Sequence, residues 1–225
     1  GVYYHDQPVL AKGKIRFYGE PVVAIVAETL EDAEEAEKGV EITYKKLPVV
    51  SNIQEAIECK AVLHEDHPDN IVSTTCVQKG NVEEGFKSSE IIIEKDFSTQ
   101  AVDHAYLETE AGISYCDPDG TIVVKSCDQD ITHHRVLLAK ILGMPINKVR
   151  VIMSPVGGGF GGKEDMIYQA ILAIATLKTN QPVKLVFSRE DSMIGSCKRH
   201  PVTMHYKIGL KSDGKIQAVK AEIRS

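Results

Sequence analysis

The chain has 225 residues, of which 43% are hydrophobic and 26% charged, and its formal net charge is −6. This composition predicts a folded globular protein, and it argues against a nucleic-acid surface, a membrane span and a signal peptide. None of the five cysteines stands in a CxxC pair, which argues against a zinc ribbon or an iron–sulfur cluster within the chain and favours the reduced thiols of a cytoplasmic protein.

The first 50 residues predict strands around one acidic helix. Residues 14–27 (KIRFYGEPVVAIVA) have the pattern of a strand, a turn and a second strand. Residues 28–39 are rich in alanine and glutamate, with Thr29 as a helix N-cap and a glycine at the end. Residues 40–44 then predict another strand.

Residues 51–78 predict a linker. They contain Pro68 within the polar cluster HEDHPDN, followed by serine and threonine. The two histidines of this cluster, with its acidic residues, could suggest a metal site. A solvated loop is the favoured interpretation.

Residues 79–148 predict alternating strands and helices. Asn81 is positioned to cap a short helix, and Asp117–Gly120 is a turn signal. A longer helix runs through residues 139–142 and ends at Gly143. Strands are expected at residues 91–97, 111–115 and 121–125.

A glycine-rich segment, residues 157–162, stands between an apolar strand at 149–156 and a helix expected from Asp165 onward. Five glycines in six residues let backbone amides approach a ligand directly. The order strand, loop, helix predicts bare N–H groups at a helix N-terminus, where anionic oxygens are favoured. Further strands are expected at residues 182–187 and 203–210, with a last hairpin strand after the turn at 212–214.

Two generic nucleotide motifs overlap in this segment. Gly157, Gly159 and Gly162 satisfy GxGxxG, although the acidic residue expected about twenty positions later is missing at that spacing. Residues 157–163 also satisfy GxxxxGK, but Glu164 stands where a P-loop needs serine or threonine. A structural glycine turn is the third interpretation.

The whole string GGGFGGKE at residues 157–164 resembles the signature of the molybdenum hydroxylases, the xanthine dehydrogenase and aldehyde oxidase family. Residues 14–28 resemble the family's α/β hammerhead domain, and residues 104–108 (HAYLE) its H-x-x-L-E element. The resemblance implies an α+β fold. It implies the C-terminal part of a hammerhead domain at 1–50, a linker at 51–78 and the N-terminal part of a molybdopterin-binding domain at 79–225, in a fragment or a cleaved chain.

The resemblance also implies site residues. Gly159, Phe160 and Gly161 would lie beside the molybdenum–pterin cofactor, with no direct metal ligand from the protein. Gln129 falls where the family has S-T-Q-N and would face the metal's ligands, although Cys127, Asp128 and Asp130 differ from that pattern. Taken alone, Gln129 could instead be a solvent-exposed residue at a strand end.

Glu164 would bind the substrate, which favours a purine or similar N-heterocycle over a simple aldehyde. Its alternative role is a helix-start glutamate that stabilises the helix dipole. His104 and Glu108 are interpreted as structural or supporting residues rather than catalytic ones.

In the family, the metal centre hydroxylates an electron-poor carbon with oxygen from water and passes electrons to iron–sulfur clusters and usually FAD. The family's catalytic glutamate lies downstream of every position here, so no catalytic residue is expected in this segment and the segment alone should be inactive. The expected partners are the rest of the molybdenum subunit and the iron–sulfur and flavin subunits or domains, with no nucleic acid and no membrane. A P-loop nucleotide-binding module and a non-catalytic interaction fragment remain the alternatives.

Overall fold

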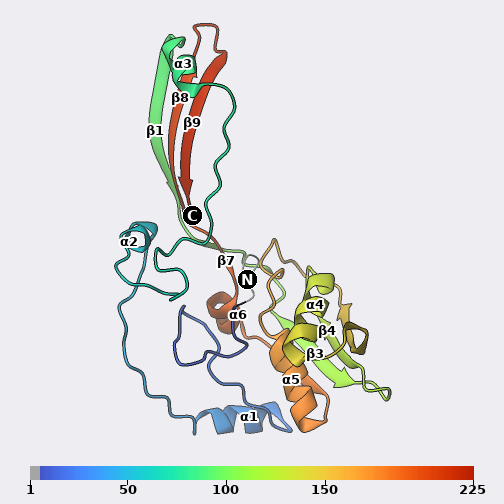
Figure 1. The fold of residues 1–225 in the computed structure, drawn as a ribbon. Helices are drawn as coiled ribbons and strands as arrows, with labels where there is room; N and C mark the ends of the chain where they lie inside the picture. The colour runs from blue at the N-terminus through green and yellow to red at the C-terminus, as the bar shows by residue number, and fades with distance from the viewer. Residues whose placement is uncertain (1–5) are drawn as a thin grey trace. The chain divides into compact units, whose positions relative to one another are not determined.

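The structure is a computed structural model that describes residues 6–225 and divides the chain into two compact units (Figure 1). In the described part of the chain, unit 1 comprises residues 6–44 and 103–198, and unit 2 comprises Lys45–Val102 and Arg199–Ser225. The predicted α+β class is confirmed, because each unit combines helices with strands. In the described part of the chain, no helix has the length and apolar character that crossing a membrane requires.

Unit 1 is built on a mixed four-stranded sheet in the order β5-β4-β3-β6. β3 pairs antiparallel with β4 and with β6, whereas β4 and β5 run parallel. A parallel pair needs a crossover, and α4 supplies it. The strands are β3 (Ala111–Cys116), β4 (Ile122–Ser126), β5 (Val149–Met153) and β6 (Val183–Val186).

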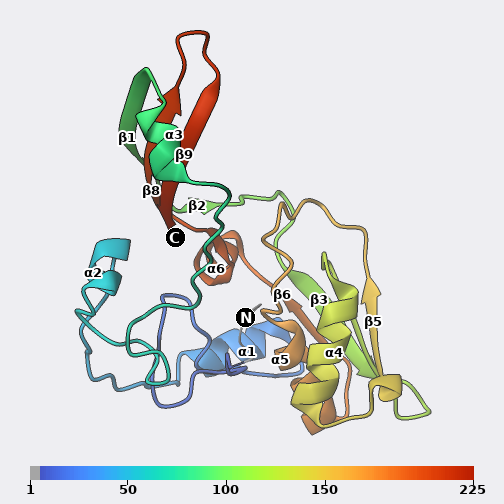
Figure 2. The same cartoon turned by 45° about the horizontal axis from the view of Figure 1, so that its top comes forward.

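Helices α4 (Ile131–Leu142) and α5 (Gln169–Thr179) pack against this sheet and against each other (Figures 1 and 2). Their contact with the strands forms the core, because the apolar side of α4 packs against β5 and that of α5 packs against β3, β4 and β6. The buried core residues are Ile122, Val124, Leu138, Ala139, Val149, Ala170 and Ala173.

The predicted end of α4 is confirmed. Gly143 adopts the left-handed conformation at φ 63°, which costs glycine little, and stops the helix. At the other end, the Asp130 side chain accepts a hydrogen bond from the His133 amide. The short helices η1 (Ile146–Lys148) and α6 (Arg189–Gly195) complete this region. The sequence analysis did not predict α6, although the capping box between Ser188 and Asp191 is a sequence signal for its start.

Residues 6–50 differ from the prediction. Helix α1 (Leu30–Glu37) forms with Thr29 as its N-cap, as expected, but residues 14–27 and 40–44 form no strand. Val23 and Val26 are largely exposed there. A strand requires a continuous ladder of backbone hydrogen bonds, and within the described residues segment 14–27 has only an isolated bond to another segment, from the Ala11 amide to the Pro21 carbonyl.

The segment after the glycines also differs. α5 begins at Gln169, not near Asp165, so the glycine loop does not run directly into a helix N-terminus. The Gln169 side-chain oxygen accepts hydrogen bonds from the amides of Ile167 and Tyr168 and thereby holds the chain outside the helix. The predicted strand at 149–156 likewise ends earlier, at Met153.

Unit 2 contains an antiparallel sheet in the order β1-β8-β9. Helix α3 (Val82–Lys87), capped by Asn81 as predicted, packs against it, and a side chain at Gly209 would collide with Ser89 and crowd Phe86. A short helix, α2 (Ile53–Ile57), lies within the segment predicted as linker. The strands are β1 (Ile91–Thr99), β8 (Val202–Leu210) and β9 (Ile216–Arg224); β2 (Val102–Asp103) pairs with β7 (Lys198–Arg199).

Candidate functional site

The glycine loop, residues 157–163, is closed by a single carboxylate oxygen. Glu108 Oε2 accepts a hydrogen bond from the Gly157 amide at 2.8 Å and from Lys163 Nζ at 2.8 Å. A backbone bond from the Glu108 amide to the Gly157 carbonyl supports the same closure. Glu108 therefore joins the two ends of the loop, which supports its interpretation as a structural residue.

Lys163 turns inward from the loop. The residue is 3% exposed, and its ammonium group lies 4.7 Å from the centre of the Tyr106 ring. Partial burial raises the pKa of Glu108, but the hydrogen bonds from Lys163 and the Gly157 amide outweigh it and hold that pKa below its usual range. A P-loop lysine must reach a bound phosphate, so this geometry contradicts the P-loop interpretation.

His104 and Tyr106 form the support behind the loop. A Cβ at Gly162 would lie 2.8 Å from Tyr106 Cε1 and 2.9 Å from His104 Nδ1, so only glycine fits there. The Tyr106 hydroxyl donates a short hydrogen bond to Glu110 Oε1, and burial raises the tyrosine pKa. His104 and Tyr106 therefore lie directly against the loop backbone at Gly162.

Gln129 is fixed by the backbone of the same loop. Its side-chain Oε1 atom accepts hydrogen bonds from the backbone amides of Gly161 at 3.1 Å and Lys163 at 3.2 Å. The backbone amide of Gln129 donates to the Lys163 carbonyl at 3.0 Å. Two donors at the oxygen decide which way the side-chain amide points. The nitrogen, with its two N–H groups, is therefore the free end of Gln129.

An open groove of about 590 Å³ runs beside Gln129. Asp128 also reaches this groove, but its two carboxylate oxygens accept hydrogen bonds from Ser126 and Gln169 inside the protein. The groove therefore offers a neutral amide donor and no uncommitted carboxylate oxygen. Its lining residues are Asp128, Gln129, Met153, Ser154, Pro155, Val156 and Gly159.

Gly159 and Phe160 form the tip of the loop. A Cβ at Gly159 would overlap the Gln129 side-chain amide, so glycine is required for Gln129 to keep its position. Phe160 is 74% exposed and adopts φ 54°, a left-handed conformation that is strained for a bulky residue. The loop therefore holds an apolar ring outward.

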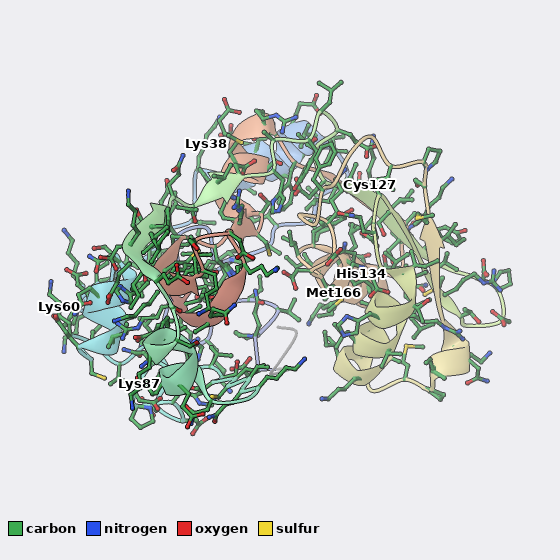
Figure 3. All side chains as sticks on the ribbon, turned by 90° about the horizontal axis from the view of Figure 1, so that it is seen from above. Lys38, Lys60, Lys87, Cys127, His134 and Met166 are labelled. Atoms are coloured by element: carbon green, nitrogen blue, oxygen red, sulfur yellow. The ribbon has the colours of Figure 1, made fainter. Side chains whose placement is uncertain are left out.

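Glu164 follows the loop with an exposed side chain and an anchored backbone. Its carbonyl oxygen lies 2.8 Å from Nε2 of His134, a fully buried residue of α4 (Figure 3). Because α5 starts five positions later, Glu164 is not a helix-start residue, and that alternative is wrong. Gln129 is exposed, as the interpretation of a solvent-exposed strand-end residue expects. However, it lies beyond the end of β4 at Ser126, and its side-chain oxygen accepts a hydrogen bond from the loop.

The structure thus brings Gln129, Gly159 and Gly161 into direct contact, and it links Glu164 to α4 through His134. Sequence reasoning missed His134 and the role of Asp128. The only signal for Asp128 was its departure from the S-T-Q-N pattern. His133 and His134 are neighbours in α4, and the sequence does not indicate which of them faces inward.

The residues at the groove fit the group that the resemblance implies. An electron-rich cofactor needs hydrogen-bond donors and close backbone approach, and the Gln129 amide nitrogen and the bare backbone at Gly159 provide these. Among residues 6–225, no group of three or more histidine, cysteine or acidic side chains is arranged to hold a metal ion directly.

Comparison with known proteins identifies the family of the chain. Residues 63–225 match the family model of the molybdopterin cofactor-binding domain, and residues 2–48 match that of the aldehyde oxidase and xanthine dehydrogenase a/b hammerhead domain. The chain is 37% identical over 224 residues to the nicotinate dehydrogenase large molybdopterin subunit of Eubacterium barkeri. It is 35% identical over 224 residues to a probable xanthine dehydrogenase subunit of Bacillus subtilis (strain 168).

The alignments cover 99% of this chain in both cases, but only 52% of the first relative and 30% of the second. The chain thus spans about half or less of these curated relatives. Among solved structures, quinoline 2-oxidoreductase from Pseudomonas putida 86 matches with a TM-score of 0.90 and 25% identity, over 96% of this chain and 28% of that one. The chain belongs to the molybdenum hydroxylase family, whose molybdopterin cofactor-binding domain it matches over residues 63–225.

Proposed function

We propose that this chain is part of the molybdenum-cofactor subunit of an oxidoreductase that hydroxylates a purine or a related N-heterocycle with oxygen from water. The orientation of Gln129 carries the proposal. Its oxygen is occupied by two loop amides, so its N–H groups are available to the groove. A neutral donor suits an oxo or sulfido group on a bound metal, because it adds no charge.

When bound, the molybdenum–pterin cofactor would supply the oxidising centre. The chain's own residues would shape its surroundings: Gly159 and Gly161 bring the backbone close, Phe160 presents a ring, and Gln129 donates hydrogen bonds. Glu164 would accept from a ring N–H of the substrate, or donate to a ring nitrogen when protonated. No residue of the segment is assigned as the catalytic base, so we expect the segment alone to be inactive.

The names of several relatives support an N-heterocycle as the substrate class, whereas the names of others refer to aldehydes or carbon monoxide. The names of the two curated relatives refer to nicotinate and xanthine, and that of the solved structure to quinoline. All three molecules carry nitrogen in an aromatic ring. Glu164 is compatible with the ring nitrogen of each molecule, so turnover measurements have to decide which heterocycle is the substrate.

We further propose that residues 1–50, 51–78 and 79–225 are the end of the hammerhead domain, a linker and the start of the molybdopterin-binding domain. The hammerhead match at residues 2–48 supports the first boundary, whereas the match to the molybdopterin cofactor-binding domain begins at residue 63, within the proposed linker. The remainder of the molybdenum subunit and iron–sulfur and flavin subunits or domains would be the partners. A cytoplasmic location remains a prediction from the scattered cysteines.

The test uses the complete native enzyme that contains this chain, wild type beside Glu164→Val and Glu164→Gln. Molybdenum content and turnover of xanthine, hypoxanthine and nicotinate are measured for each. We expect all three proteins to contain molybdenum and Glu164→Val to turn over the preferred heterocycle with a much higher KM. An unchanged KM in Glu164→Val would remove the substrate role of Glu164, and a native enzyme without molybdenum would overturn the proposal.

A further inference from the structure

A buried polar network lies within unit 1, next to the glycine loop. Asp128 Oδ2 accepts a hydrogen bond from Ser126 Oγ at 2.5 Å, and Asp128 Oδ1 accepts one from Gln169 Nε2 at 2.5 Å. His134 Nδ1 lies 3.1 Å from Asp128 Oδ2, an ion-pair distance that is off the line of an ideal hydrogen bond. All four side chains are at most 2% exposed. Burying such groups is costly, so their arrangement calls for an explanation.

The His134 ring connects this network to the loop. Its Nδ1 faces a carboxylate, and its Nε2 lies 2.8 Å from the carbonyl oxygen of Glu164. Both partners are acceptors, so the ring serves them best with a proton on each nitrogen. Nothing else fixes Glu164 as directly: among residues 6–225, no hydrogen bond or ion pair holds its carboxylate.

We infer that His134, oriented by Asp128, is a positioning residue that fixes the backbone at Glu164 and so directs the Glu164 carboxylate. This inference rests on the proposed function, in which that carboxylate binds the heterocycle. The support for Glu164 lies inside the core of unit 1. Asp128 is held there by hydrogen bonds from Ser126 of β4 and Gln169 of α5, and His134 belongs to α4. A side chain on an exposed loop acquires a fixed direction only when its backbone is tied to such a support.

Two substitutions separate positioning from packing. In His134→Gln, the amide nitrogen falls near the place of Nε2 and can still donate to the Glu164 carbonyl. In His134→Asn, the nitrogen falls near Nδ1, where it can reach Asp128 but not Glu164. A purely structural role predicts that Asn performs as well as Gln, because Asn retains the partner of the buried carboxylate.

We expect the reverse in the complete native enzyme. His134→Asn should raise KM for the preferred heterocycle about tenfold, because the misdirected Glu164 carboxylate would lose its hydrogen bond to the substrate. The kcat and the molybdenum content should change little. His134→Gln should stay close to the wild-type KM. Hydrogen exchange of the amides at 157–165, measured on the enzyme without substrate, should quicken in His134→Asn and not in His134→Gln.

The Glu164→Val background distinguishes the positioning role of His134 from the substrate role of Glu164. If His134 acts through Glu164, His134→Asn should have no further effect on KM in that background. An enzyme in which Glu164→Val raises KM but His134→Asn behaves like His134→Gln, in KM and in exchange, would overturn the positioning role alone. An enzyme in which Glu164→Val leaves KM unchanged would instead overturn the substrate role on which the inference rests.

Discussion

The carboxylate of Glu108 and the ammonium group of Lys163 lie 2.8 Å apart, and the lysine side chain is almost completely buried. This ion pair connects the segment before β3 to the end of the glycine loop, 55 positions later. The same oxygen also holds the Gly157 amide. The shape of the loop therefore depends on a residue that lies outside the glycine motif.

Replacing Glu108 with alanine should leave the Lys163 ammonium group buried without its partner. We expect the free energy of unfolding to fall by about 2 to 3 kcal/mol, less than for a fully buried pair because Glu108 is partly exposed. Thermal unfolding of the complete subunit measures this change. The control is Glu35→Ala, which breaks an exposed pair with Lys38 and should cost well under about 1 kcal/mol. Equal losses in the two variants would contradict the structural role of Glu108.

Gln129→Glu should separate loop stability from cofactor contact. One carboxylate oxygen can still accept from the amides of Gly161 and Lys163, but the other brings negative charge to the groove in place of two N–H donors. We expect near-wild-type thermal unfolding and a fall in kcat of about 10²-fold, the usual effect of losing a donor at a reacting centre. Molybdenum content and steady-state turnover are the measurements, and full turnover in this variant would contradict the orientation of Gln129.

Gly159→Ala should displace Gln129, because the new Cβ would overlap the glutamine side chain. We expect lower molybdenum content in the purified enzyme, measured by metal analysis. Gly39→Ala is the matched control, since a Cβ there meets only one backbone oxygen at 3.5 Å. Wild-type metal content in Gly159→Ala would show that this close approach does not matter.

The contribution of His134 to stability should depend on pH. Burial by itself lowers the pKa of His134, but its interactions with Asp128 and the Glu164 carbonyl, and the charge of Asp130, together raise it above 6.5. A raised pKa in the folded state means that the contribution is fully present below pH 6.5 and is lost as the pH rises through the raised value. The unfolding temperature of wild type minus that of His134→Gln should therefore be larger at pH 6 than at pH 9.5. A constant difference would contradict the charged form of His134.

Cys197 should resist alkylation. Burial and then its contact with Asp165 raise the pKa of the thiol to about 12, so little thiolate is present at pH 8.5. Asp165→Asn removes the neighbouring negative charge and should make Cys197 react faster with iodoacetamide, as followed by peptide mass spectrometry. Equal labelling rates in wild type and variant would show that Asp165 does not control this thiol.

Local signals in the sequence determined much of unit 1. Thr29 and Gly143 marked helix ends because capping depends on one side chain or one backbone conformation. The alternating apolar residues of β3 and the β-branched residues of β4 predicted these strands, because both patterns are local in the sequence. The GGGFGGKE string pointed to the family, and the family match over residues 63–225 confirmed it.

Only the tertiary structure decided how the loop is held. Glu108 and Gln129 lie 49 and 32 positions from the loop residues that they contact, and His134 lies 30 positions from Glu164. No local pattern encodes such pairings. The strands expected at 14–27 failed for a related reason, since strand formation depends on a partner elsewhere in the chain. Local conformation follows from neighbouring residues, whereas a site assembled from distant segments depends on how the core brings them together.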